Sequence, residues 1–179
     1  MPRKLLIRTS EYPYHITCRS NNKEWFYIPL TDVWWHSLTL LREGVELFRV
    51  DIRAFVLMSN HYHILIFTPE CNLDKFMQFF NRELTRRINF QAGRINRVLG
   101  GRYKWSLIRS HQYYVTALRY IYQNPVRAGL VKHCSHWPFS DLDTQGHGTE
   151  FRRWIEKPMS ASDSEKTRKK LRRYVLETG

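Results

Sequence analysis

The chain has 179 residues, with 29 Lys and Arg against 16 Asp and Glu, and so a formal net charge of +13 at pH 7. This length favours one domain with a short appended segment, and the excess of positive charge indicates a polyanionic partner, first of all nucleic acid. A ribosomal or membrane-surface protein is the alternative. The three cysteines form no C-x-x-C pair, which argues against a zinc site or a disulfide framework. No run of about 18 uncharged apolar residues occurs, so we predict no membrane span and a cytoplasmic location.

The first half of the chain predicts a strand, a helix and a hairpin. β-branched and aromatic residues over 12–19 predict the strand. Apolar residues at helical spacing over 30–46 predict the helix, with Thr31 or Asp32 as its N-cap. Over 49–58 every second residue from Val50 is apolar, which predicts a strand with one apolar side. Ser59-Asn60 is then expected to turn the chain into a return strand.

The second half predicts two more helices around a short strand. Asn72 is expected to cap a helix that runs to about Asn89 and carries one apolar stripe. Glycines at 100–101 lead to a short extended segment, and a further helix is expected from Ser110 until Pro125 ends it.

This order of strands and helices predicts an α+β fold, a ferredoxin-like antiparallel sheet with helices packed on one face. We expect a domain over residues 1–145 and a basic C-terminal tail or helix over 146–179, opened by Ser162 and Glu165 as a capping box.

Two histidines on one predicted strand are the first candidate site. His61 and His63 are two residues apart, so their imidazoles project from the same side of the strand and could bind one metal ion. The alternative is a pair of hydrogen-bonded or half-exposed strand histidines, because short motifs arise by chance.

The helix that follows carries tyrosines of two kinds. Tyr120 lies away from its apolar stripe, one turn before Asn124, whereas Tyr122 lies nearer the stripe and is expected to be a packed tyrosine with a satisfied hydroxyl. Tyr120 could also be structural, as most helical tyrosines are. The amide oxygen of Asn124 could be a third metal ligand, or the residue could be a C-cap.

These segments carry a family resemblance. MSNHYHILI, then RYIYQNPVRAGLV, together with YHIT, GGRYKWSLI and WPFSDL, resemble the single-tyrosine HUH transposases, above all the REP-associated tyrosine transposases. The middle position of the family's histidine motif is a bulky apolar residue and is Tyr62 here. The resemblance implies Tyr120 as nucleophile, His61, His63 and Asn124 as ligands of Mg²⁺ or Mn²⁺, and cleavage of single-stranded DNA, at a hairpin, through a 5′-phosphotyrosine. His15, in YHIT, would lie near the site, where we expect a structural hydrogen bond.

Cations in three places are candidate DNA contacts, since lysine and arginine bind backbone phosphates. One set lies on an exposed helix face, where it could equally be a solvated surface, and comprises Lys75, Arg82 and Arg86. A second precedes the tyrosine helix and comprises Arg102 and Lys104, next to Trp105, which could equally be core. The third is the tail: Lys166, Arg168, Lys169, Lys170, Arg172 and Arg173.

We therefore predict a metal-dependent single-stranded DNA endonuclease and strand transferase, as a monomer or homodimer. A domesticated, non-catalytic nucleic-acid-binding protein of the same fold is the alternative. An HUH relaxase or replication initiator would share the bond chemistry and differ in partners.

Overall fold

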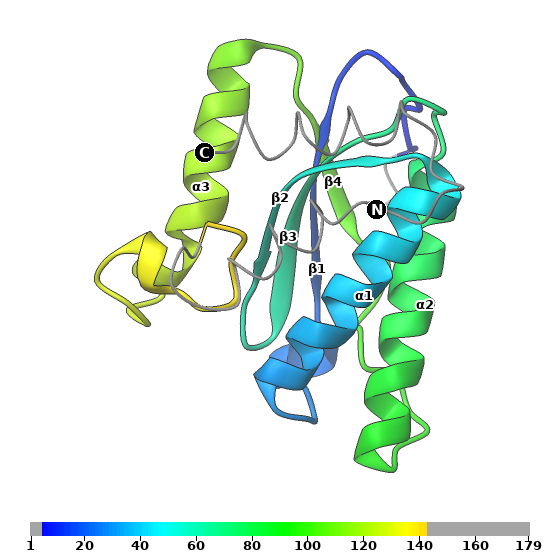
Figure 1. Cartoon of the computed structure of the whole chain (residues 1–179), viewed down its shortest axis with the longest axis vertical. Coiled ribbons are helices and arrows are strands. Elements are labelled where there is room, and N and C mark those ends of the chain that lie inside the picture. Colours follow the sequence, from blue (N-terminus) through cyan, green and yellow to red (C-terminus); the bar gives the residue numbers. More distant parts are fainter. Residues whose placement is uncertain (1–4, 143–179) are drawn as a thin grey trace, which may run out of the picture.

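A computed structural model describes residues 5–142 and shows one antiparallel sheet with three long helices (Figure 1). The sheet has the strand order β2-β3-β1-β4. In chain order the elements are β1 (Tyr14–Arg19), the 3₁₀ turn η1 (Asn21–Lys23), α1 (Leu30–Phe48), β2 (Asp51–Leu57), β3 (His61–Phe67), α2 (Leu73–Ala92), β4 (Lys104–Leu107), α3 (His111–Arg127) and the 3₁₀ turn η2 (Cys134–His136).

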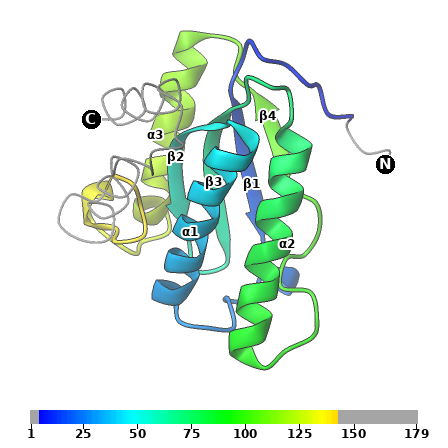
Figure 2. The ribbon, with the colours of Figure 1, turned by 45° about the vertical axis from the view of Figure 1, so that its right-hand side comes forward.

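The helices form layers on both faces of the sheet. Figure 2 shows α1 and α2 side by side on one face, where they pack against each other and bury the larger apolar core. α3 lies over β2 and β3 on the opposite face, above a smaller apolar cluster that includes Ala117 and Ile121. The predicted ferredoxin-like antiparallel sheet with helices packed against it is confirmed, and α3 adds a layer on the second face.

β2 departs from the simple alternation that its sequence suggests. Its register with β3 shifts between Ile52 and Ala54, so Arg53 is an extra residue. Such a bulge reverses the side on which later residues point. Val50 and Ile52 accordingly join the larger core, whereas Ala54 and the alternate residues after it join the cluster under α3. The prediction of one continuous apolar side was wrong, because β2 is buried on both faces.

Two expected helix boundaries are corrected, and a third, at Asn72, is confirmed without the expected capping bond. α1 begins at Leu30 with Pro29 as N-cap, ahead of both predicted caps. The Asn72 side chain makes no capping bond, because its Nδ2 donates to the carbonyl oxygen of Phe48 at 2.8 Å, which ties α2 to the end of α1. Pro125 is buried inside α3, which continues for two residues. A proline costs a helix one N–H bond, and burial of its ring offsets that loss.

The predicted tail helix, its capping box and all six tail cations lie outside the described residues. The division at residue 145 stays a prediction. Within 5–142, no helix is both long and apolar enough to cross a membrane.

The contact between α1 and α2 leaves no room beside Gly44. An added Cβ there would lie 2.9 Å from Cδ2 of the buried Phe76 ring and closer still to Cε2. We expect Gly44→Ala to lower the free energy of unfolding, since overpacking costs about 1–3 kcal/mol and outweighs about 1 kcal/mol of helix propensity. Urea unfolding measures the change. Gly101→Ala, which adds a methyl group in open space, is the control. Equal stability of both variants would show that Phe76 moves aside freely.

Candidate active site

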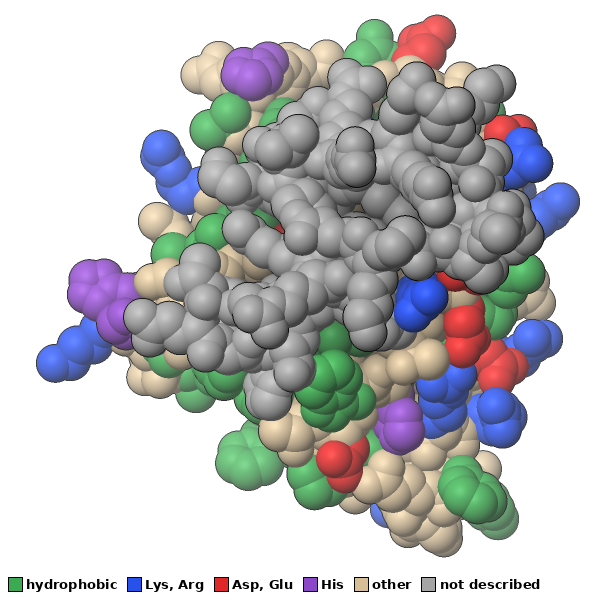
Figure 3. All heavy atoms as spheres, viewed as in Figure 1, with side chains coloured by type: hydrophobic (Ala, Val, Ile, Leu, Met, Phe, Trp, Pro, Cys, Tyr) green, Lys and Arg blue, Asp and Glu red, His purple; other side chains and the backbone are tan. Residues whose placement is uncertain are grey.

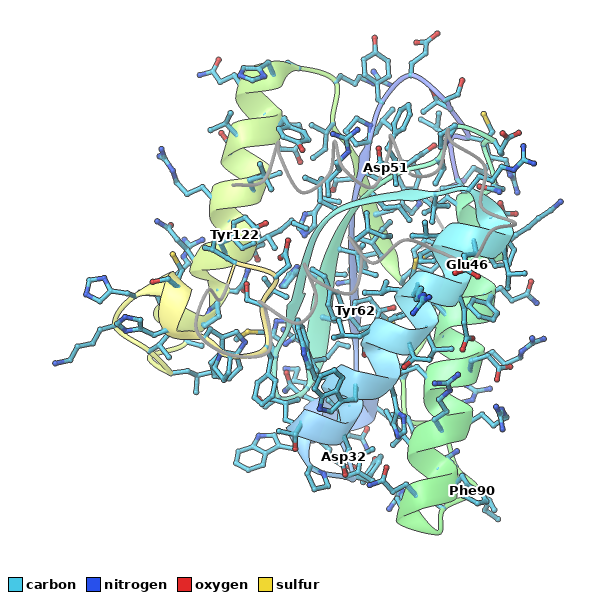
Figure 4. All side chains as sticks on the ribbon, viewed as in Figure 1. Asp32, Glu46, Asp51, Tyr62, Phe90 and Tyr122 are labelled. Carbon is cyan, nitrogen blue, oxygen red and sulfur yellow. The ribbon has the colours of Figure 1, made fainter. Side chains whose placement is uncertain are left out.

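Alternation along β3 separates its histidines from the larger core. Tyr62 points to the α1 and α2 side, where it is fully buried (Figure 4). His61 and His63 point to the opposite side, toward α3, with their ring centroids 5.1 Å apart. The prediction that both imidazoles share one face of a strand is confirmed.

Hydrogen bonding determines which nitrogen of His61 is available. The side-chain Nδ2 of Asn60 donates to the carbonyl oxygen of Lys23 at 2.7 Å, which orients the Asn60 amide. The other amide atom, Oδ1, lies 2.7 Å from Nδ1 of His61 and can only accept. The proton of the neutral His61 ring is therefore on Nδ1, which leaves a lone pair on Nε2.

His63 is held by a third histidine. Its Nδ1 lies 3.0 Å from Nε2 of His15 on β1, and the two rings stack with centroids 5.2 Å apart. The Nε2 atom of His63 is buried and has no hydrogen-bond partner within the described part of the chain. A buried polar atom left without a partner costs about 1–3 kcal/mol, so such an atom in a native fold calls for a functional explanation.

α3 brings Tyr120 to these rings. Its ring centroid lies 5.7 Å from that of His63 and 5.8 Å from that of His15, edge to face in both cases. One turn later, Nδ2 of Asn124 donates to the carbonyl oxygen of Tyr120 at 2.8 Å, so the amide oxygen is left for another partner beside His63. The guanidinium of Arg127 lies over the Tyr120 ring, 5.5 Å from its centroid.

Burial makes the three imidazoles poor bases. It lowers the pKa of His15 and that of His61 to about 4, in the latter case with help from the positive charge of Arg19. Burial also lowers the pKa of His63 well below 6.5, as do the neighbouring histidines, while Asn124 opposes the shift. All three rings are therefore neutral at pH 7, the form in which imidazole binds metals.

Few donors are available for a metal ion. Across residues 5–142, no group of three or more His, Cys, Asp and Glu is arranged to hold one. The Nε2 atom of His15 is engaged by His63. His61 and His63 lie side by side, and Asn124 lies beside His63. Imidazole nitrogens and an amide oxygen are donors that could hold a divalent cation whose other ligands are water or phosphate oxygens.

Two further residues of the site were absent from the predicted set. Arg127 stands seven positions after Tyr120, and this two-turn spacing could have indicated their shared helix face. His15 was expected to make only a structural hydrogen bond, and that bond reaches directly into the site.

The predicted DNA-contacting cations divide between two surfaces. Lys75, Arg82 and Arg86 are exposed on α2, on the face of the sheet opposite to the histidines, and the last two pair with Glu83. Blue and red side chains alternate along the right edge of the molecule, beside α1 and α2 (Figure 3). Arg102 and Lys104 instead line a groove together with Arg19. Trp105 belongs to the core, edge to face with Tyr14.

Fold and site together define a ferredoxin-like α+β protein with two histidines and a helix tyrosine converging on one sheet face. Residues 8–123 match the family model described as "Transposase IS200 like", and the chain belongs to this family of transposases. The resemblance inferred from the motifs is thereby confirmed.

Individual relatives agree with this assignment. A REP-associated tyrosine transposase of Escherichia coli (strain K12) is 32% identical over 90 residues, which are 50% of this chain and 53% of the relative. The match thus spans about half the length of that protein. A solved REP-associated tyrosine transposase bound to a REP hairpin shares the fold, with a TM-score of 0.65 at 23% identity over 92% of this chain and 96% of that chain.

The two tyrosines of α3 should differ in their effect on stability. The Tyr122 hydroxyl, on the sheet side of α3 (Figure 4), donates at 3.1 Å to the buried Asp141 carboxylate, whereas the Tyr120 side chain is 42% exposed. We expect Tyr122→Phe to lower the free energy of unfolding by about 1–3 kcal/mol and Tyr120→Phe by less than about 0.5 kcal/mol. Thermal or urea unfolding compares them. A larger loss for Tyr120→Phe would mean that its hydroxyl has a structural role.

Proposed function

We propose that the protein is a metal-dependent single-stranded DNA endonuclease and strand transferase with Tyr120 as its nucleophile. One observation carries the proposal: Tyr120 packs against His63 and His15 within one chain while its side chain stays partly open to solvent. A tyrosine needed only for packing would have its hydroxyl satisfied inside the fold, as Tyr122 does.

The reaction is a phosphoryl transfer. The Tyr120 oxygen attacks the phosphorus of a DNA phosphodiester, a Tyr–O–P bond forms, and the bond from phosphorus to the 3′ oxygen breaks. The leaving strand ends in a 3′ hydroxyl, which takes up the proton that the phenol gave up. A 3′ hydroxyl attacking the phosphotyrosine reverses these changes and joins strands without an external energy source.

His61, His63 and Asn124 would hold a divalent metal ion, Mg²⁺ or Mn²⁺. When bound, the ion polarises the scissile phosphate and stabilises negative charge in the transition state. The protein's own part is orientation. Asn60 and His15 engage the Nδ1 atoms of His61 and His63, which fixes both rings and leaves each Nε2 for the metal ion.

Arg127 would act on the same phosphate. Its guanidinium lies over the Tyr120 ring, so a phosphoryl group on the tyrosine oxygen would be within reach of a cation that binds phosphate well. A bound metal ion and Arg127 would both supply positive charge to a phosphate at Tyr120.

The substrate we propose is a single strand next to a DNA hairpin. The positive net charge suits a polyanion, and a relative of the same fold has been solved bound to a REP hairpin. A strand that is unpaired at the cut gives the tyrosine access to the phosphodiester, which base pairing and stacking would restrict.

Tyr120→Phe should abolish the covalent protein–DNA adduct while folding and DNA binding persist, because only one exposed oxygen is lost. Each variant is incubated with Mn²⁺ and labelled hairpin oligonucleotides from the source genome, and adducts are resolved on a denaturing gel. Tyr122→Phe is the matched control and should still form the adduct. An adduct with Tyr120→Phe would refute the nucleophile, and no adduct with the wild-type protein on any hairpin would favour a non-catalytic binder.

His61→Ala and His63→Ala should each weaken Mn²⁺ binding and abolish cleavage while leaving DNA affinity near that of the wild type. Loss of a partner that merely supports a ligand costs roughly 10 to 100-fold in metal affinity, and loss of the ligand should cost at least as much. Electron paramagnetic resonance of free Mn²⁺ measures binding without reference to activity. His111→Ala, at the exposed start of α3, is the control. Undiminished Mn²⁺ binding by both site variants would remove the metal assignment.

A further inference from the structure

A basic groove lies beside the histidines. It has a volume of about 550 Å³ between the end of β1, η1 and the segment 100–104. Four of its lining residues are cations and none is acidic: Arg19, Lys23, Arg102 and Lys104. We propose that this groove binds the backbone of the single DNA strand that runs from the cleavage site, an inference that rests on the proposed function.

Strand register makes the groove continuous with the site. His63 pairs with Thr17 on β1, and Thr17 pairs with Lys104 on β4. Directly opposed residues of antiparallel strands point to the same side of the sheet, so these three side chains share the α3 face. Arg19 is opposite His61 in the same way. At about 4.8 Å between strands, Lys104 stands about 10 Å from His63, the length of about three stacked nucleotides at 3.4 Å each.

Among the described helices, α3 covers only part of this sheet face. α3 packs mainly against β2 and β3, and it reaches β1 where Tyr120 contacts His15. Arg19 and Lys104 are exposed, and among the described residues neither forms an ion pair, whereas Arg82 and Arg86 on α2 share Glu83. Within residues 5–142, the positive charge of these two side chains is therefore not offset by an ion pair with a carboxylate.

The walls of the groove are held in place before any ligand arrives. The amide of Gly100 donates to the carbonyl oxygen of Arg19 at 3.0 Å, and that of Asn21 donates to Val98 at 2.8 Å. A Cβ at Gly100 would come within 3.1 Å of the Ser20 carbonyl oxygen, so glycine permits this close approach. Binding a strand here requires little reordering of the backbone, which favours affinity.

Asn60 joins the groove to the proposed metal site. Its amide nitrogen donates to the Lys23 carbonyl in the groove wall, and its amide oxygen accepts from His61. Its backbone carbonyl also accepts from the amide of Ser20 at 2.8 Å. Asn60 thus fixes the position of the groove wall relative to His61. A DNA strand bound in the groove would therefore be held in a fixed position relative to the proposed metal ligand.

The test compares two double variants that each remove two positive charges: Arg19→Gln with Lys104→Gln in the groove, and Lys75→Gln with Arg82→Gln on α2. Both are made in the full chain carrying Tyr120→Phe and measured in chelator, so the result does not depend on cleavage. Affinity for a hairpin oligonucleotide with single-stranded arms is titrated against salt. We expect the groove pair to reduce the slope of log affinity on log salt by about 1.4, two contacts at about 0.7 each for single strands.

Arm length supplies the second readout. Wild-type affinity should rise as one arm is extended past the cleavage position, and the groove pair should lose this rise. Arg19→Lys with Lys104→Arg, which keeps both charges, should restore it. If the groove pair unfolds, Lys23→Gln with Arg102→Gln in the loops replaces it. A wild-type slope and a wild-type response to arm length in a folded groove variant would overturn the proposal, whether or not Tyr120 proves to be the nucleophile.

Discussion

The pairing of β3 with β1 and β2 is the constraint on which the rest of the structure depends. Tyr62, Ile64 and Ile66 fill the core beneath α1 and α2, and each fully buried apolar side chain contributes about 1.5–3 kcal/mol. A shift of one residue would move them to the α3 face and place the polar histidines in the core beneath α1 and α2, so the register is strongly determined. The position of His61 and His63 on the other face is therefore a consequence of core packing.

The site occupies the border between that sheet face and α3, where polar groups are expensive to bury. His63 is 3% exposed, and among the described residues its Nε2 atom has no hydrogen-bond partner. The hydrogen bond to His15 holds its ring in one orientation. The stable apolar layers on both sides offset this cost. Such an arrangement sacrifices some stability to keep a lone pair available, which is typical of functional sites.

Charge is distributed unevenly between the two faces. On α1 and α2, arginines pair with carboxylates, as Arg87 does with Glu43 at 3.1 Å, so that surface is of mixed sign. Around the histidines the cations Arg19, Lys104 and Arg127 are exposed, and none of them forms an ion pair within residues 5–142. A field of one sign over one face directs an anionic partner toward that face.

By itself the sequence determined what local periodicity encodes: the order of strands and helices, the shared side of His61 and His63, and the one-turn spacing of Tyr120 and Asn124. A motif resemblance supplied the family. Periodicity could not reveal the bulge at Arg53 or the continuation of α3 through Pro125, because cross-strand pairing and burial decide both. Only the tertiary structure placed α3 over β3, brought His15 to His63 and formed the basic groove from two segments about eighty residues apart. Contacts between such distant segments follow from sheet register and packing rather than from any local sequence pattern.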